Sequence, residues 1–448
     1  MSPELEITET REPARSDLKA RTIGSMVWTF VGFGFQQVLR LASNLILTRL
    51  LHLPRIFGLM SVVSIVIGGL EMLSDVGIGP AIVHSKRGDD PRFLNTSWSV
   101  QISRGLILGV ITVVLAKPMS WIYDEPQLFP LLLVAAISPV IRGFNSSRIS
   151  SHHRKINQGS IIRLELITQV TALIATVGSA ALLRSVWALL IGWLVGDLTR
   201  MLLSHIILPG QRNRMEWDKE AARELVHVGR WIILGTAVSY GVQQFDRLTL
   251  GRLLSMEQLG IYNMAIYMCG AVLMVGQTVG RKVLFPMLSE TIRQDPDRLV
   301  PRTRKVRTLW VVPTTAALLV LAVWGEQVIR ILYPPQFHGA GWMLRILAAG
   351  SIFAAINQSY TMLWLALGEF RMNTFMMIVQ LPVLIGAMAA GYYFRGLTGF
   401  VIGVACVEMI VCPLQAFLMF RRRLWQPKLD LPLVAVSGAL VALGFWLV

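Results

Sequence analysis

The sequence predicts an all-α protein that crosses a membrane many times, and two properties of the 448-residue chain lead to this prediction. Hydrophobic residues make up 54% of the chain and charged residues only 15%, whereas about a quarter of the residues in a soluble domain carry charge. The hydrophobic residues also form runs of about twenty, the length that an α-helix needs to cross about 30 Å of hydrocarbon. The bilayer is therefore the solvent for most of the chain.

We expect about thirteen membrane-spanning helices, with a range of 12–14, because apolar runs of this length recur along the whole chain between short polar segments. The last run is short and could cross the membrane only in part. The expected spans are residues 23–48, 56–83, 93–116, 127–148, 159–183, 186–206, 225–251, 258–280, 308–332, 341–367, 372–394, 397–420 and 431–448.

The distribution of Lys and Arg predicts the orientation of these spans. If the N-terminal segment lies in the cytosol, the segments on the cytosolic side carry 27 of the 42 basic residues and the opposite segments carry 6. Such a bias is typical of membrane proteins, whose basic loops stay on the cytosolic side. We therefore expect a cytosolic N-terminus, and we attribute the net charge of +16 to topology rather than to nucleic-acid binding.

The two halves of the chain carry a short repeated pattern. Residues 29–40 and 236–247 both read T-x6-Q-Q-x-x-R, and each copy continues to R-L-L and then to a glycine, Gly58 or Gly260. Six spans separate the copies, so both have the same orientation in the membrane, as in transporters built from parallel repeats. The expected organisation is a cytosolic tail 1–20, an N-lobe of six helices 21–206, a cytosolic linker 207–224, a C-lobe of six helices 225–420, and a basic loop with a C-terminal helix 421–448.

Arginines inside the expected spans are the candidates for substrate binding. A charge at the centre of a bilayer costs at least about 2.5–3.5 kcal/mol, so these side chains should face protein or water. Arginine outnumbers the acidic residues in the spans, and its forked guanidinium suits phosphate oxygens. Two glutamines share the polar stripes of the repeat helices with an arginine. The candidate set is Arg40, Arg104, Arg142, Arg163, Arg247, Arg345, Gln36 and Gln243.

For each candidate the alternative is a structural bond between helices. Glu71, Asp75 and Asp246 are expected either to take part in ion coupling or to hold these arginines. Asp197 and Arg200 lie three residues apart on one helix, which favours a local ion pair. Arg200, Arg230 and Arg330 lie near span ends, where a long side chain can reach the membrane surface.

Signatures of enzymes and metalloproteins are missing from the sequence. The three cysteines fall in apolar runs without the spacing of a metal site, and there is no glycine-rich loop that ends in Lys-Ser or Lys-Thr. The pair His152-His153 lies in a basic loop and lacks further metal ligands, so contact with lipid headgroups is the better interpretation. We expect no cofactor, no metal and no catalytic residue.

Several motifs resemble the polysaccharide-transporter family of lipid-linked oligosaccharide flippases, within the multidrug/oligosaccharidyl-lipid/polysaccharide exporter superfamily. They are Q-Q-V-L-R-L (36–41), L-S-D-V-G-I-G-P-A-I-V (73–83), L-N-T-S-W-S (94–99), F-D-R-L-T-L-G-R-L-L (245–254) and L-F-P-M-L-S (284–289). The resemblance implies two six-helix lobes around a cationic cavity, a substrate of undecaprenyl-pyrophosphate-linked sugar, and alternating access driven by an ion or substrate gradient. Many relatives have fourteen spans, one more than expected here.

The sequence therefore predicts a flippase of lipid-linked oligosaccharide in the bacterial inner membrane, with membrane lipid and the polysaccharide polymerase and export machinery as possible partners. One alternative is a multidrug exporter of the same superfamily, which would need an acidic cavity for cationic drugs. Another is a membrane polymerase or glycosyltransferase of the same pathway. The short loops on the outer side argue against that alternative.

Overall fold

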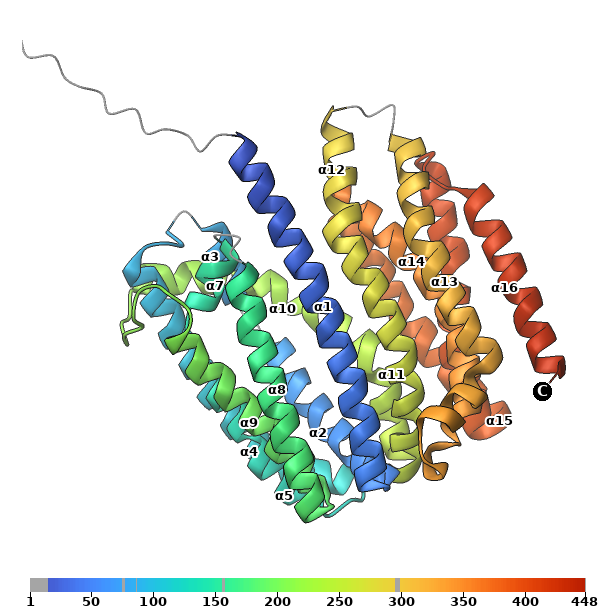
Figure 1. Cartoon of the computed structure of the whole chain (residues 1–448), viewed down its shortest axis with the longest axis horizontal. Coiled ribbons are helices and arrows are strands. Elements are labelled where there is room, and N and C mark those ends of the chain that lie inside the picture. Colours follow the sequence, from blue (N-terminus) through green and yellow to red (C-terminus); the bar gives the residue numbers. More distant parts are fainter. Residues whose placement is uncertain (1–14, 75–76, 86, 155–157, 295–298, 448) are drawn as a thin grey trace, which may run out of the picture.

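The computed structural model describes residues 15–74, 77–85, 87–154, 158–294 and 299–447, and most of them lie in helices (Figure 1). No β-strand occurs in these ranges, and the predicted all-α fold is confirmed. The N-terminal half contains α1 (Arg15–Leu51), α2 (Pro54–Leu73), α3 (Ile78–His84), α4 (Pro91–Ile122), α5 (Leu128–Ala135), α6 (Ile137–Gly143), α7 (Arg148–Arg154), α8 (Gln158–Leu183) and α9 (Val186–Ile206). The C-terminal half contains α10 (Lys219–Leu253), α11 (Met256–Val279), the π-helix η1 (Gly280–Leu284), α12 (Phe285–Gln294), α13 (Leu299–Leu332), the 3-10 helix η3 (Pro335–Phe337), α14 (Ala340–Ala366), α15 (Phe370–Arg421) and α16 (Pro427–Leu447).

Each expected span lies mostly in helical residues of the described ranges, but the count of thirteen stays a prediction. Within the described ranges, eight helices are long and apolar enough to cross a membrane, or nine if the bent pair 128–143 and 148–154 is one span. The expected span 56–83 is broken after α2, because Gly77 takes the left-handed conformation that favours glycine (φ 63°). The expected tail 1–20 also differs, since α1 begins within it at Arg15.

The expected spans 372–394 and 397–420 together form α15, which is a helical hairpin. The helix is interrupted at Arg395 and Gly396, and Gly396 has a φ of 57°. The two arms are so close that a Cβ atom on Gly391 would lie 2.0 Å from the carbonyl oxygen of Gly399. Glycine at this crossing therefore lets the chain reverse within a few residues.

The two halves of the chain meet at the end of the molecule that carries the α1–α2 and α10–α11 turns, which we call the closed end. Gly58 of α2 faces the start of α11, and a Cβ there would lie 1.9 Å from the carbonyl oxygen of Met256. Gly260 of α11 makes the reciprocal approach, and its Cβ would lie 1.9 Å from the carbonyl oxygen of Pro54. The two glycines of the sequence repeat thus meet each other across the halves.

Aromatic and polar contacts extend this junction. The rings of Phe57 and Phe337 pack edge to face, 5.6 Å apart between centroids. The hydroxyl of Tyr333 donates a hydrogen bond to Oδ1 of Asn44, 2.8 Å away on α1. The largest cluster of buried apolar side chains also lies here, on α2, α5, α11 and α14. In Figure 1, α1 and α12 lie well apart at the opposite end, where α1 begins. The packing therefore holds the molecule shut at one end.

Residues 207–218 join the halves at the opposite end, which we call the linker end, and they run as an extended strap along α4. The sequence predicted a longer linker, 207–224, but α10 already begins at Lys219. Side chains at the start of α4 accept hydrogen bonds from alternate backbone N–H groups of the strap, at 3.0–3.1 Å. The pairs are Arg214 to Asn95, Glu216 to Ser99 and Asp218 to Thr96. The strap is thus bound to the N-terminal half along its length.

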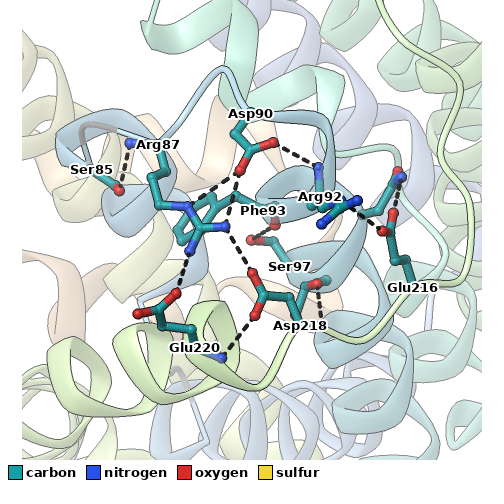
Figure 2. Close-up of polar contacts among 11 residues, drawn as sticks. Ser85, Arg87, Asp90, Arg92, Phe93, Ser97, Glu216, Asp218 and Glu220 are labelled. Carbon is teal, nitrogen blue, oxygen red and sulfur yellow. Dashed lines mark hydrogen bonds and ion pairs between the residues drawn. The ribbon is translucent and has the colours of Figure 1, made fainter.

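Arg87 binds the end of this strap at its junction with α10 (Figure 2). Its guanidinium lies 2.8 Å from the carboxylate of Asp218 and 3.0 Å from that of Asp90, and it stacks 5.9 Å from the centroid of Phe93. The Arg87 hydrogen bond is the main reason why the pKa of Asp218 lies below its ordinary value of 3.8. Asp218 also caps α10 by accepting from the N–H of Glu220 at 2.9 Å.

Candidate functional site

A cavity of about 540 Å³ lies between α1, α8 and α9, and Tyr267 of α11 contributes to its wall. Gln36 and Arg40, two candidates from the sequence, line it from α1. They lie four residues apart and so share one face of the helix. Nε2 of Gln36 donates to the Glu165 carboxylate at 3.1 Å, and Gln169 donates to the carbonyl oxygen of Gln36 at 3.0 Å. We call this space the α1/α8 cavity.

Cations in and near this cavity lack carboxylate partners. Within the described part of the chain, no Asp or Glu oxygen lies within ion-pair distance of Arg40, Arg200 or Arg163. Arg40 and Arg200 line the cavity, and Arg163 lies exposed near the start of α8. Glu165 is the acidic residue of the cavity wall, so two guanidinium groups face one carboxylate. Such an excess of arginine favours an anionic ligand.

The expected local pair of Asp197 with Arg200 is not present, because Asp197 is bound to a different arginine. The Arg142 guanidinium lies 2.8 Å from Asp197 and 2.8 Å from Glu71, and so joins α6 to α9 and α2. Arg104 donates to the hydroxyl of Ser74 at 3.0 Å and to the backbone oxygen of Glu71. These arginines therefore hold helices together in the present arrangement.

A second cavity of about 350 Å³, the α2/α4 cavity, is lined by Glu71, Arg104, Arg142 and Tyr240. Trp193 of α9 lines the α1/α8 cavity, and the Arg142 guanidinium lies 5.7 Å from the centroid of its indole ring. The stack of Trp193 and Arg142 thus stands between the two cavities. One of them offers arginines without carboxylate partners, and the other offers charges that are already paired.

The candidates Gln243, Asp246 and Arg247 lie close together on α10, and none of them lines the α1/α8 or the α2/α4 cavity. Arg247 donates to Gln244 at 3.1 Å, and Gln243 donates to Ser239 at 2.9 Å, both within α10. Asp246 is buried and accepts a hydrogen bond from the Tyr262 hydroxyl at 2.7 Å, which ties α10 to α11. In the present arrangement these candidates therefore lie apart from Gln36 and Arg40 of the α1/α8 cavity.

Arg345 is buried within the C-terminal half, with 5% of its surface exposed. Its guanidinium lies 3.3 Å from the carboxylate of Glu326 on α13. Glu326 lies inside the expected span 308–332, and nothing in the sequence pattern marks it as the partner of Arg345. This burial and pairing favour a structural role for Arg345. Asp75, another candidate, lies outside the described residues.

A family described as polysaccharide biosynthesis protein matches residues 46–342. The chain belongs to this family. The lipopolysaccharide biosynthesis protein WzxC of Escherichia coli strain K12 is 22% identical over 444 residues, which cover 94% of this chain and 88% of the relative. The resemblance drawn from the sequence motifs is therefore confirmed.

Two solved transporters share the fold of this polysaccharide biosynthesis protein. The lipid II flippase MurJ in an inward closed conformation gives a TM-score of 0.74 at 11% identity and covers 93% of this chain and 92% of its own. An inward-facing multidrug resistance MATE family transporter of the MOP superfamily gives a TM-score of 0.68 at 13% identity. The match covers 89% of this chain and 98% of the transporter. The protein is thus an integral membrane protein with the fold of a transporter.

Lys282 was not among the candidates for substrate binding, because its segment was expected to be a loop. The span 258–280 continues without a break through η1 and α12, so Lys282 lies on the same helical rod as α11. Its ammonium group lies 5.9 Å from the ring centroid of Phe33 on α1. The apolar residues Val283, Leu284 and Phe285, without a turn residue, are the sequence signal that could have extended the span.

Proposed function

We propose that this protein is a flippase that moves undecaprenyl-pyrophosphate-linked oligosaccharide across the bacterial inner membrane by alternating access. The observation that carries the proposal is the α1/α8 cavity, where Arg40 and Arg200 face the space without a carboxylate partner. Membership of the polysaccharide biosynthesis family supports the same conclusion. No bond is made or broken in such transport, so we propose no catalytic residue, cofactor or metal.

The packing suggests which side the cavity serves. We place the linker end in the cytosol, because the basic segments gather there and basic loops stay on the cytosolic side. The closed end would then face outward, sealed by Gly58, Gly260 and the Tyr333–Asn44 hydrogen bond. This arrangement suits a state that receives its substrate from the cytosolic side, where we expect the lipid-linked sugar to be made.

Each part of the substrate has a different physical requirement. The pyrophosphate carries the charge, and forked guanidinium groups such as Arg40 and Arg200 can donate paired hydrogen bonds to its oxygens. Gln36 can donate from the same wall once it leaves Glu165. The polyprenyl chain needs no cavity, because it can stay in the bilayer beside the helices. The halves would then separate at the closed end and release the headgroup outside.

The remaining candidates take supporting roles in this proposal. Arg104 and Arg142 hold α2, α4, α6 and α9 in register, and Glu71 neutralises Arg142. Arg142 could bind the headgroup only after it breaks its ion pairs with Asp197 and Glu71. A polymerase and export machinery would use the translocated sugar on the outer side. A multidrug exporter is less favoured, because a cationic drug would be repelled by arginines without partners.

Transport into vesicles tests the proposal. The purified protein is reconstituted with a fluorescent undecaprenyl-pyrophosphate oligosaccharide, and translocation is scored by protection from a membrane-impermeant quencher. Losing a charge-assisted hydrogen bond of about 1.5–3 kcal/mol should slow loading by about 10- to 150-fold in Arg40→Gln. Arg252→Gln, which changes an exposed arginine at the closed end, is the matched control. If wild type moved no substrate, or if Arg40→Gln matched Arg252→Gln, the proposal would fail.

A further inference from the structure

A carboxyl group without a cationic partner lies halfway along the second arm of α15. Glu408 stands about midway between the break at Gly396 and the end of the helix at Arg421. The groups that act on its side chain are two carboxamides, Asn357 of α14 and Gln380 of the first arm. Within the described residues, no Lys, Arg or His nitrogen lies within ion-pair distance of it. Every arginine cluster described above is therefore separate from this carboxyl.

The two carboxamides hold one carboxyl oxygen each. Nδ2 of Asn357 lies 2.7 Å from Oε2 of Glu408 and also donates to the backbone oxygen of Glu408 at 3.1 Å. Nε2 of Gln380 lies 2.7 Å from Oε1. Asn357 is buried, and its Oδ1 atom has no hydrogen-bond partner in the described structure. Three helical segments thus converge on one acid.

Glu408 is half-buried within a membrane-spanning helix, where the ionised form of an acid is expensive. A carboxylate taken out of water without a counter-ion loses its hydration, and such groups normally become neutral. In a membrane segment an acidic side chain without a pairing cation is by default a functional residue. The charge can be neutralised by a proton or by a bound cation, and a proton is favoured because both carboxamides turn N–H groups, which cannot ligate a cation, towards the carboxyl oxygens.

The carboxamides can satisfy Glu408 in both of its protonation states. When the acid is ionised, Asn357 and Gln380 both donate to it, as in the present geometry. When it is protonated, its O–H must find an acceptor, and a half-turn of the Gln380 amide presents Oε1 in place of Nε2. Within the described residues Gln380 bonds to Glu408 alone, so this half-turn breaks no other hydrogen bond. Asn357 stays in place, held by the backbone oxygen.

We propose that Glu408 is the proton-binding site through which this transporter couples substrate movement to a proton gradient, with Gln380 as the adjustable acceptor and Asn357 as the fixed donor. This inference rests on the proposed function. The step is a protonation alone: a proton from one side binds Glu408 in one state of the protein and leaves to the other side in another. The other titratable groups nearby are Cys412, one turn along α15, and Asp430 of α16. Asp430 is already paired with Arg307 at 2.8 Å.

The test compares accumulation with and without a proton gradient in the same vesicles. One proton per substrate makes a gradient of one pH unit worth about a tenfold accumulation. Wild type and the matched control Glu257→Gln, an exposed acid at the closed end, should both show this ratio. The ratio should fall to about one in Glu408→Gln, which keeps the volume and the hydrogen bonds but cannot release a proton. A pH-sensitive dye should report substrate-linked proton movement for wild type and none for Glu408→Gln.

Each failure has its own meaning. No translocation by wild type under any gradient overturns the proposed function itself. Translocation that ignores the pH gradient, that follows a sodium gradient instead, or that responds fully in Glu408→Gln overturns this inference and leaves the flippase standing. If Glu408→Gln does not fold, Gln380→Met removes the acceptor while keeping Glu408. Its gradient ratio should then fall, and an unchanged ratio refutes the role of the carboxamide pair.

Discussion

Replacing Gly58 by alanine should open the closed end of the molecule. The added Cβ would lie 1.9 Å from the carbonyl oxygen of Met256, whereas Cβ atoms in real structures stay beyond 3.0 Å from such neighbours. The two helices must therefore separate by about 1 Å at this point. Forced overpacking of this kind costs about 1–3 kcal/mol, and the open state escapes that cost. A bias of this size shifts the equilibrium towards the open state by about 5- to 150-fold.

Labelling from outside measures this shift. Ser43 lines the α1/α8 cavity, so Ser43→Cys in a background without the native cysteines reports access from the outer face to an impermeant maleimide. Gly58→Ala should raise the labelling rate within the range above, and Gly260→Ala should do the same. Gly270→Ala is the matched control, because it lies on α11 with nothing within 4 Å of its added Cβ. Equal rates for Gly58→Ala and Gly270→Ala would refute the idea that this crossing seals the closed end.

Three further changes test the ion pairs and the strap. Arg142→Gln leaves two carboxylates without their partner and should lower the melting temperature. Breaking a fully buried pair costs roughly 3–5 kcal/mol of stability, and the loss here should be smaller because 37% of the Arg142 side chain is exposed. Arg307→Gln strands the buried carboxylate of Asp430 and should cost about 3–5 kcal/mol, seen as early protease cleavage in α16; intact α16 would contradict this. The pKa of Asp218 lies below 3.8, so the strap is stabilised above that pH and should lose amide protection from exchange as the pH falls further. Asp218→Asn should already reduce that protection at neutral pH, and unchanged exchange in residues 211–218 would contradict the role of Arg87.

Patterns carried by one helix were the ones that the sequence could predict. The apolar runs located the helices, and the repeated motif ending in Gly58 and Gly260 marked two residues that meet in the fold. Gln36 and Arg40 were placed together by helical spacing, and they do line one cavity. Their proposed role in binding stays a prediction.

Pairing between helices was beyond the reach of the sequence. Asp197 has an arginine three residues away, yet it binds Arg142 of another helix, and no periodicity encodes that choice. Arg345 similarly finds Glu326 across the turn between α13 and α14. A buried arginine has the same appearance in a sequence whether its partner is a carboxylate or a substrate. Only the tertiary contacts distinguish the two cases: Arg142 is paired with carboxylates, whereas Arg40 faces a cavity without a carboxylate partner.

The strap has a consequence for how the two halves are joined. Its backbone is bound along α4 by side chains of the N-terminal half, and these bonds all lie after the segment between Ile206 and Gln211, which Arg148 of α7 also holds through the carbonyl oxygens of Leu208 and Gln211. A chain cut there would still carry, on its C-terminal piece, an extended segment able to dock on Asn95, Thr96 and Ser99. Two separately synthesised pieces should therefore assemble in the native register. The start of α10 would then move with the N-terminal half, although in the sequence it is part of the C-terminal half.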